Sequence, residues 1–302
     1  MSQTHEEENT KSVERIVQRT VLFGLLVALA LVAGYYLAIA LIPTPKIGVI
    51  YLDTQVGGPT VEAMSQEINY ARKARDIKAV VLMVNSPGGG ASSGHDIYYQ
   101  MRKLRAEKPI VASVDVLAAS AAYQIAVGAT EIYAKPASFI GNIGVIVGLP
   151  APETLSEQFI TTGPFKATAF SATGIVQKLD LLYANFRDSV VAERKAAPNP
   201  LKLDPDAVAT GELWVGLEAK EHGLIDELGS KLDAIDRAAE LAGLSHYEVV
   251  NVRDEYLSSL EGTPQYPTAM KVYEELDNQP EIDLSAQSSD WPSFYQMYIP
   301  LE

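Results

Sequence analysis

The sequence of 302 residues contains no cysteine. This absence excludes a disulfide framework, a thiolate metal site and a cysteine nucleophile. Positive charge is also scarce, because 24 Lys and Arg stand against 38 Asp and Glu, giving a formal net charge of -14. Nucleic-acid phosphates are bound by a concentrated basic face, which the sequence lacks, so we expect no nucleic-acid partner. The 47% hydrophobic content is enough to bury a sizeable core in one or two domains.

Residues 21–42 carry no charge at all. At a rise of about 1.5 Å per residue, a helix of this length covers the hydrocarbon core of a bilayer. The alternatives are a cleavable signal peptide and a buried core helix. A signal peptide has a hydrophobic region of roughly 7–15 residues behind a short basic start, whereas this run is longer and begins further into the chain. We therefore expect a retained, single transmembrane helix.

The charges on either side of this span predict its orientation. Lys11, Arg15 and Arg19 precede it, and only Lys46 follows closely. By the positive-inside rule, residues 1–20 form a cytoplasmic segment. We therefore expect a single-pass protein of the cell membrane, with its N-terminus in the cytoplasm and any catalytic domain on the outer face.

Beyond the span, segments rich in β-branched residues alternate with segments of helical periodicity. The expected strands are residues 46–53, 79–85, 109–115, 131–134 and 143–147. The expected helices are residues 60–75, 94–107, 119–129, 181–196 and 231–242. Such alternation, with strands apolar on both faces, predicts a layered α/β fold with a largely parallel sheet. We place this domain at residues 46–250, and we expect the polar remainder, residues 251–302, to form a partly ordered C-terminal tail.

A glycine-rich loop with the sequence NSPGGG occupies residues 85–90, between an expected strand and an expected helix. Loops at such strand ends face the ligands of α/β sheets, and glycines let backbone N–H groups approach a developing negative charge. A phosphate loop is the obvious competitor. However, no Lys-Ser or Lys-Thr follows the glycines at the required spacing, and the dinucleotide pattern has no suitable acidic partner. A tight turn that uses glycine for geometry alone is the structural alternative.

Ser120 lies in an uncharged, alanine-rich stretch just after an expected strand. A serine at the first turn of a helix has the next backbone N–H groups unpaired and directed at whatever its hydroxyl attacks. Taken alone, a serine among alanines is more often a small core residue, and a nucleophilic hydroxyl also needs a base. A Ser-His-Asp triad has little support: His222 has no evident buried carboxylate to orient it, and the other histidines are His5, His95 and His246.

Lysine is the better candidate for that base. Lys166 is the only charged residue between Glu157 and Lys178, and Pro164 and Phe165 precede it. An exposed lysine with a pKa of about 10.4 is less than roughly 0.1% neutral at pH 7. Apolar burial lowers the pKa of lysine by up to about 3–5 pH units, which makes it a working base near neutrality. The alternative is a lysine that extends its ammonium group to solvent.

Five segments, taken in order, resemble the signal peptide peptidase A family of membrane-anchored Ser-Lys serine proteases. They are NSPGG at 85–89, AASAAY at 118–123, GNIGVI at 141–146, GPFK at 163–166, and GELWVG with GLIDELG at 211–216 and 223–229. The order and spacing of these motifs make the resemblance specific, and it covers residues 46–250. It implies a Clp protease/crotonase-like fold built from repeated ββα units.

The resemblance also implies roles for individual residues. Ser120 is similar in place to the family's nucleophile and Lys166 to its general base. The backbone N–H groups of Gly89 and Ala121 correspond to the oxyanion hole. The family further implies a homo-oligomeric ring, in which the serine and lysine of one site come from one subunit or from two neighbours, and it implies no metal or other cofactor.

Three positions depart from the family's pattern. Many members have Gly-Gly after the serine, where this chain has Ala121 and Ala122. Backbone donors survive this change, although the room for the substrate backbone shrinks. Many members have a serine thought to hold the lysine at the position of Asn142, and an amide can hold Lys166 by hydrogen bonding as well.

These observations predict a membrane-anchored serine endopeptidase that cleaves small, apolar peptide segments in or near the bilayer, such as remnant signal peptides. An acyl-CoA hydratase of the same fold would need paired acidic residues, and only Asp96 and Asp115 lie near either loop. A third hypothesis is a catalytically inactive membrane scaffold that binds peptides through the same groove. The sequence leaves it open because the distance from Ser120 to Lys166 is a property of the folded assembly.

Overall fold

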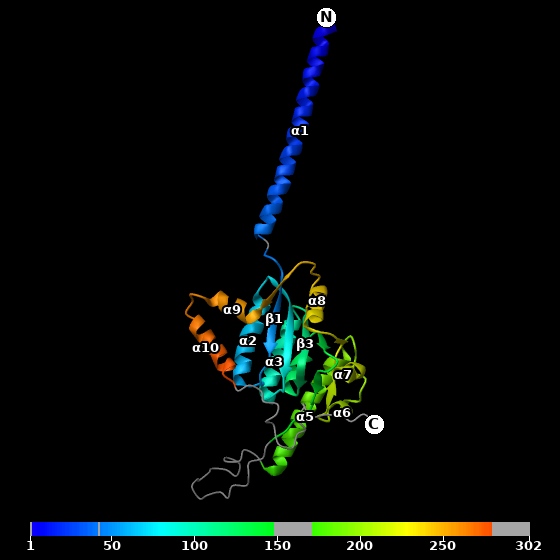
Figure 1. Ribbon diagram of the computed structural model, residues 1–302, viewed down its shortest axis with the longest axis vertical. Helices are drawn as coiled ribbons and strands as arrows, with labels where there is room; N and C mark the ends of the chain where they lie inside the picture. Colours follow the sequence, from blue (N-terminus) through cyan, green and yellow to red (C-terminus); the bar gives the residue numbers. More distant parts are fainter. Residues whose placement is uncertain (1, 42, 148–170, 280–302) are drawn as a thin grey trace. The chain divides into compact units, whose positions relative to one another are not determined.

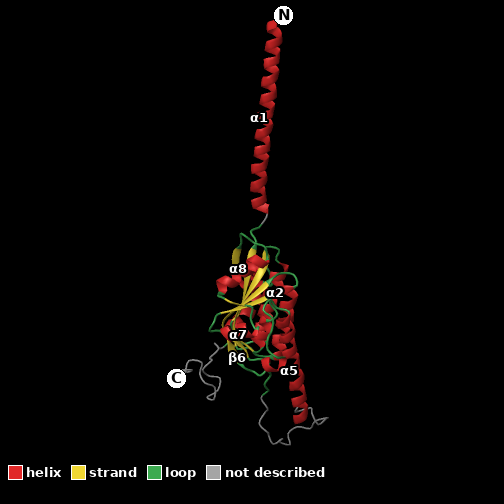
Figure 2. Ribbon diagram, turned by 90° about the vertical axis from the view of Figure 1, so that its right-hand side faces the viewer, coloured by secondary structure: helices red, strands yellow, loops and turns green. Residues whose placement is uncertain are grey.

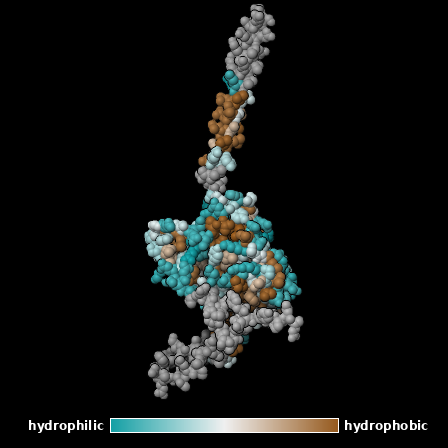
Figure 3. All heavy atoms as spheres, in the orientation of Figure 1, coloured by the Kyte–Doolittle hydropathy of each residue, from teal (hydrophilic) through white to brown (hydrophobic). Residues whose placement is uncertain are grey.

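The computed structural model describes residues 2–41, 43–147 and 171–279, and it divides into two units, Met1–Thr44 and Pro45–Glu302. The first unit is one long helix, α1 (Ser2–Leu41). Its stretch Gln18–Leu37 has a mean hydropathy of 2.2 and is long and apolar enough to cross a membrane. Figure 3 shows the apolar band along this helix. The expected apolar helix is therefore present, and residue 42 lies outside the described part.

The second unit is built on an eight-stranded sheet (Figure 1). Its strands run in the order β6-β5-β3-β2-β1-β8, with β4 beside β3 and β7 beside β4. All pairings are parallel except that of β5 with β6. The strands are β1 (Lys46–Leu52), β2 (Ile77–Ser86), β3 (Ile110–Ala119), β4 (Glu131–Ala134), β5 (Phe139–Gly141), β6 (Leu213–Val215), β7 (Glu227–Leu228) and β8 (Glu248–Asn251). The predicted layered α/β fold with a largely parallel sheet is confirmed.

Strand β3 changes partners along its length. Its first half pairs with β4, from Val111 to Val114, and its second half pairs with β5, from Leu117 to Ala119. One prediction near this point is wrong, because residues 143–147 form no strand. The physical reason is that Asn142 has a φ of 51°, a left-handed conformation that turns the chain out of the sheet after β5.

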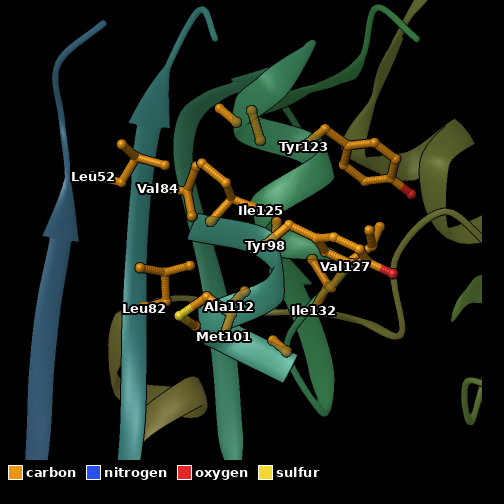
Figure 4. Packing of buried hydrophobic residues seen from close by; sticks show 14 of the residues in the cluster. Leu52, Leu82, Val84, Tyr98, Met101, Ala112, Tyr123, Ile125, Val127 and Ile132 are labelled. Atoms are coloured by element: carbon orange, nitrogen blue, oxygen red, sulfur yellow. The ribbon is translucent and has the colours of Figure 1, made fainter. Parts of the chain in front are cut away.

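Helices cover both faces of the sheet, as the two hydrophobic cores show. The larger core lies between the sheet and helices α2 (Gly58–Lys73), α3 (Ala91–Arg105) and α4 (Ala121–Ala126). The smaller core lies between the opposite face and helix α8 (Lys231–Leu241). Alternate strand residues supply the two cores: Leu82 points into the larger one and Val81 into the smaller one. Figure 2 shows α2 and α8 on opposite sides of the strands, and Figure 4 shows the larger core from close by.

Three further helices follow the region that the structure leaves undescribed: α5 (Ala172–Lys195), α6 (Pro205–Val208) and α7 (Gly216–His222). A buried ion pair fixes the C-terminal end of α5. The guanidinium of Arg194 donates to both carboxylate oxygens of Asp226, at 2.8 and 2.9 Å. Asp226 also accepts a hydrogen bond from the backbone N–H of Ile132 at 2.7 Å. This end of α5 is therefore tied to the sheet through β4.

The described part of the C-terminal segment contains two helices. Within the segment 251–302, predicted as a partly ordered tail, α9 (Val252–Leu260) and α10 (Tyr266–Asp277) are regular helices that pack beside α2 (Figure 1). Ala269 and Tyr273, one helical turn apart, are buried in this contact. Two apolar residues in a largely polar segment give too weak a periodicity to predict a packed helix. Residues 280–302 lie outside the described part.

Candidate active site

Ser120 lies at the junction of β3 and α4, where it is the N-cap residue of the helix. Its φ of 54° and ψ of -125° are strained for a residue with a side chain, and such strain costs about 1–3 kcal/mol. The surrounding backbone holds it in place, because its N–H donates to the carbonyl of Gly141 at 2.9 Å and its carbonyl accepts from Gln124 N–H at 3.0 Å. A strained serine at a sharp strand-to-helix turn is the arrangement that exposes a nucleophilic hydroxyl.

Helix α4 gives this turn a rigid base. All six of its residues are buried, and the hydroxyl of Tyr123 donates to the carbonyl of Leu224 at 2.7 Å. In Figure 4, Ile125 lies against the β2 strand residue Val84, within the larger core. The small residues around Ser120 let α4 sit directly on its neighbours: a Cβ on Gly94 of α3 would lie only 2.8 Å from the Cβ of Ala121.

The glycine-rich loop after β2 touches the serine turn. Gly88 has a φ of 89°, and a Cβ there would lie 2.6 Å from the carbonyl oxygen of Ala119 and 2.8 Å from the N of Ala121. Gly89 has a φ of 157°, and its Cβ would lie 2.2 Å from the carbonyl oxygen of Val56. Only glycine fits at these two positions, both because of the positive φ and because of the close backbone contacts.

Hydrogen bonds to Val56 determine which groups of this loop are free. The N–H of Val56 donates to the carbonyl of Gly88 at 2.8 Å, and the N–H of Gly90 donates to the carbonyl of Val56 at 2.9 Å. The N–H of Gly89 lies between them and has no acceptor among the described residues. The N–H of Ala121, at the first position of α4, likewise has none there. Two unpaired backbone donors in adjacent loops are what an oxyanion hole requires.

A cleft of about 680 Å³ opens between these loops and helix α5. Ser120, Ala121 and the glycine-rich loop line one side, and Asn142 lies beside them. The apolar part of the lining comes largely from α5 and from the chain after β5: Val145, Ile146, Leu182, Tyr183 and Phe186.

No Asp, Glu, Lys or Arg is among the described residues that line this cleft. A site for phosphate would need positive charge or a helix N-terminus with a basic partner, and a hydratase would need acidic residues. Asp96 and Asp115 are not part of the lining, and Asp115 pairs with Lys135 instead. The described lining therefore fits an uncharged, partly apolar ligand.

Asn142 combines a left-handed backbone with a held side chain. Its backbone N–H donates to the carbonyl of Glu212 at 2.7 Å, and its side-chain Nδ2 donates to the carbonyl of Gly211 at 2.8 Å. Asn142 lines the cleft, and its side-chain oxygen is a hydrogen-bond acceptor. Such an acceptor is suited to an ammonium group, as expected for the residue that holds Lys166. Lys166 itself lies outside the described residues, so its pairing with Ser120 and Asn142 stays a prediction.

Histidine reaches the cleft in one place that the sequence did not reveal. The ring of His95 lines the cleft, and its contacts are the carbonyl of Ala91 and the side chains of Gln124 and Asn185. None of these partners is a carboxylate, so the described residues provide no Ser-His-Asp triad. Because His95 and Asn185 are 90 positions apart in the sequence, no local pattern could have paired them.

Comparison with known proteins defines the class. Residues 45–140 match the Clp protease family model, in agreement with the parallel sheet and the two strand-end loops, and residues 102–245 match the model of peptidase family S49. Protease 4 of Salmonella typhi is 33% identical over 214 residues, which are 66% of this chain and 34% of that protein. The chloroplastic serine protease SPPA of Arabidopsis thaliana is 26% identical over 211 residues, which are 64% of this chain and 30% of that protein.

Among solved structures, a mutant of the 1510-N membrane-bound stomatin-specific protease aligns with a TM-score of 0.48 and 16% sequence identity, over 66% of this chain and 86% of that chain. The chain spans about a third of the length of the two curated relatives. It has a Clp protease-like fold. Residues 102–245 resemble peptidase family S49, and the predicted resemblance to the signal peptide peptidase A family is confirmed.

Proposed function

We propose that this protein is a serine endopeptidase that uses Ser120 as nucleophile and Lys166 as general base. The observation that carries the proposal is the strained turn at Ser120, which stands beside two backbone N–H groups with no described acceptor. The match of residues 102–245 to peptidase family S49 supports the same reaction. The chemistry needs no metal or other cofactor, since a neutral lysine and two N–H donors supply the base and the oxyanion hole.

The reaction proceeds in two halves. The neutral amine of Lys166 takes the proton of the Ser120 hydroxyl as its oxygen attacks the substrate carbonyl carbon, and the resulting oxyanion accepts hydrogen bonds from Gly89 and Ala121 N–H. The ammonium of Lys166 then gives its proton to the leaving amine, and the acyl-enzyme forms. Water, deprotonated by Lys166, attacks the ester, and the proton returns to Ser120 as the acid product leaves.

The described lining of the cleft carries no Asp, Glu, Lys or Arg, which supports an apolar peptide as substrate. Small or apolar segments in or near the bilayer, such as remnant signal peptides, are the substrates that we propose. The apolar stretch at 21–42 anchors the protein in the cell membrane, and the basic residues before it put the N-terminus in the cytoplasm and the peptidase on the outer face.

We also propose a homo-oligomeric ring. Exposed apolar residues on α5 and beside the cleft support a contact with a second copy: Leu181 is 71% exposed and Ile146 is 97% exposed. Burial of such side chains between subunits stabilises an assembly by about 25 cal/mol per Å² of apolar surface.

The test is cleavage of a fluorogenic apolar peptide by the full-length protein in detergent, from pH 6 to pH 10. We expect Ser120→Ala and Lys166→Ala each to lower turnover by at least about 10³-fold, while Lys195→Ala, at an exposed lysine on α5, leaves it unchanged. Wild-type activity should rise with a single deprotonation below about pH 10. Full activity of Lys166→Ala would contradict the Ser-Lys mechanism, and an inactive wild type would favour the peptide-binding scaffold.

A further inference from the structure

The two sides of the cleft are formed by different elements of the fold. The reactive side belongs to the loops after β2 and β3, which are rigidly held by backbone contacts. The apolar side includes Leu182, Tyr183 and Phe186 of α5. The width of the cleft therefore depends on how α5 is held against α3 and α4.

The C-terminal end of α5 is held independently of the cleft. Arg194 pairs with Asp226 at 2.8 Å, and Glu193 accepts a hydrogen bond from Arg105 of α3 at 2.9 Å. Glu193 and Arg194 lie seven and eight residues beyond Phe186, which is roughly 11–12 Å along a helix. They anchor the helix in the fold but leave its cleft-lining part to be fixed by other contacts.

His95 supplies such a contact. Its Nδ1 lies 2.9 Å from the carbonyl oxygen of Ala91, one turn earlier on α3. Its Nε2 faces the side-chain amide of Asn185 on α5 and lies 3.2 Å from the Nε2 of Gln124 on α4. Gln124 also reaches the hydroxyl of Ser189 on α5, at 3.4 Å. One imidazole thus joins three helices, and Asn185 directly precedes Phe186.

The hydrogen-bonding roles follow from the partners. The Ala91 carbonyl only accepts, so the ring proton sits on Nδ1. Nε2 then accepts a hydrogen bond, for which the Nε2 of Gln124 is a donor. Asn185 meets the ring with its side-chain oxygen, and turning that amide over presents its Nδ2 as a donor instead. Both ring nitrogens are thereby occupied, so His95 is not a base for Ser120. His95 therefore affects the cleft by fixing the position of α5.

We propose that His95 is a positioning residue, which joins α3 and α4 to α5 through its Nε2 and so sets the size of apolar side chain that the cleft accepts. This inference rests on the proposed peptidase function for its kinetic consequences. Its structural basis, the three-helix contact, is independent of whether the serine is catalytic.

Two amide variants distinguish the contribution of Nε2 from that of Nδ1. The amide of His95→Gln takes the place of Nε2 and keeps the contacts to Asn185 and Gln124, whereas the amide of His95→Asn takes the place of Nδ1 and loses them. We would measure kcat and KM of the full-length protein for two peptides that differ only in Ala or Leu at the cleavage position. Loss of one hydrogen bond of about 1 kcal/mol predicts that His95→Asn changes the ratio of the two KM values about fivefold, with kcat within about twofold. His95→Gln should restore the wild-type ratio.

Asn185→Ala should reproduce His95→Asn, because it removes the same contact from the α5 side. A purely structural role would instead lower the active fraction, and hence the apparent kcat, without changing KM. The proposal is overturned if His95→Asn keeps the wild-type preference, or if His95→Gln fails to restore it while both variants melt at the wild-type temperature.

A binding experiment keeps this test separate from the proposed function. In the Ser120→Ala background, the Kd values of the same two peptides should show the same change of preference on adding His95→Asn. If the wild type cleaves nothing but this change appears, the peptidase proposal fails and the positioning role stands. If cleavage depends on Ser120 and Lys166 as predicted but the peptide preference is unchanged in His95→Asn, the peptidase proposal stands and the positioning role fails.

Discussion

The cleft and the contact of α2 with the C-terminal helices are built on opposite principles. The reactive side of the cleft uses small uncharged residues, backbone donors and positive φ angles at Gly88, Gly89 and Ser120. The α2 contact uses charged side chains brought together from distant parts of the sequence. The groups proposed for catalysis are thus mainly backbone groups of two short loops. The charged side chains of the α2 contact instead affect how helices pack.

The α2 contact centres on Glu67, a buried carboxyl group. Burial raises the pKa of Glu67 to about 8, and Arg253 and Tyr273 oppose the rise. Arg253 is shared, because it donates to both carboxylate oxygens of Asp277, at 2.9 and 2.6 Å, and lies 4.3 Å from the centre of the Tyr273 ring. Glu67 therefore has no cation of its own among the described residues, and its ionised form is disfavoured.

The largest effect should come from the glycine-rich loop. Gly89→Ala places a Cβ 2.2 Å from the carbonyl oxygen of Val56, so the loop must move and one donor of the proposed oxyanion hole moves with it. We expect activity to fall about 10²–10³-fold, the cost of one such donor, with a loss of unfolding free energy of about 2–4 kcal/mol. The measurements are kcat and denaturant unfolding.

Gly90→Ala is the matched control for this substitution. Its added Cβ would lie 3.5 Å from the Ser93 hydroxyl oxygen and 3.8 Å from the carbonyl oxygen of Val56, which are ordinary contacts. We expect near-wild-type activity and stability. Equal losses in Gly89→Ala and Gly90→Ala would show that the loop is merely sensitive to any side chain.

The α2 contact should respond to pH, with a sign set by Glu67. Because its pKa is raised above the unfolded value of 4.5 to about 8, the folded protein binds more protons than the unfolded one between these values. The unfolding free energy should therefore be highest near pH 4.5 and fall as pH rises to about 8, at up to roughly 1.4 kcal/mol per pH unit. Glu67→Gln should remove this slope and stabilise the protein at pH 9 by about 1–3 kcal/mol.

Glu62, exposed on the same helix, provides the control. Glu62→Gln should leave the pH dependence of the unfolding free energy unchanged, since an exposed carboxylate contributes little. An undiminished slope in Glu67→Gln would contradict the assignment of the pH dependence to this buried group.

The smallest effect should come from relieving the backbone strain at Ser120. Ser120→Ala and Ser120→Gly both remove the hydroxyl, but only glycine adopts the φ of 54° without steric cost. We expect Ser120→Gly to be more stable than Ser120→Ala by about 1 kcal/mol, measured by thermal unfolding. Equal stability would show that the turn is unstrained.

The sequence predicted the features that depend on local patterns and missed those that depend on contacts between distant residues. Strands β1, β2 and β3 were predictable because each is a local run of β-branched residues. Ser120 and the glycine-rich loop could be found because their motifs are short, and their catalytic roles stay predictions. The prediction of a strand at 143–147 is wrong because the left-handed backbone of Asn142 turns the chain out of the sheet. Helix α10 and the His95 contact were missed because their partners lie tens to hundreds of positions away, where a local pattern carries no signal.

The most direct test of the account is covalent labelling of the full-length protein, in detergent, with a fluorophosphonate probe, followed by peptide mass spectrometry. The account predicts one major adduct, on Ser120, that is absent from Ser120→Ala, strongly reduced in Lys166→Ala and unchanged in Ser92→Ala, at an exposed serine on α3. An unlabelled Ser120, or labelling that is indifferent to Lys166, would contradict it.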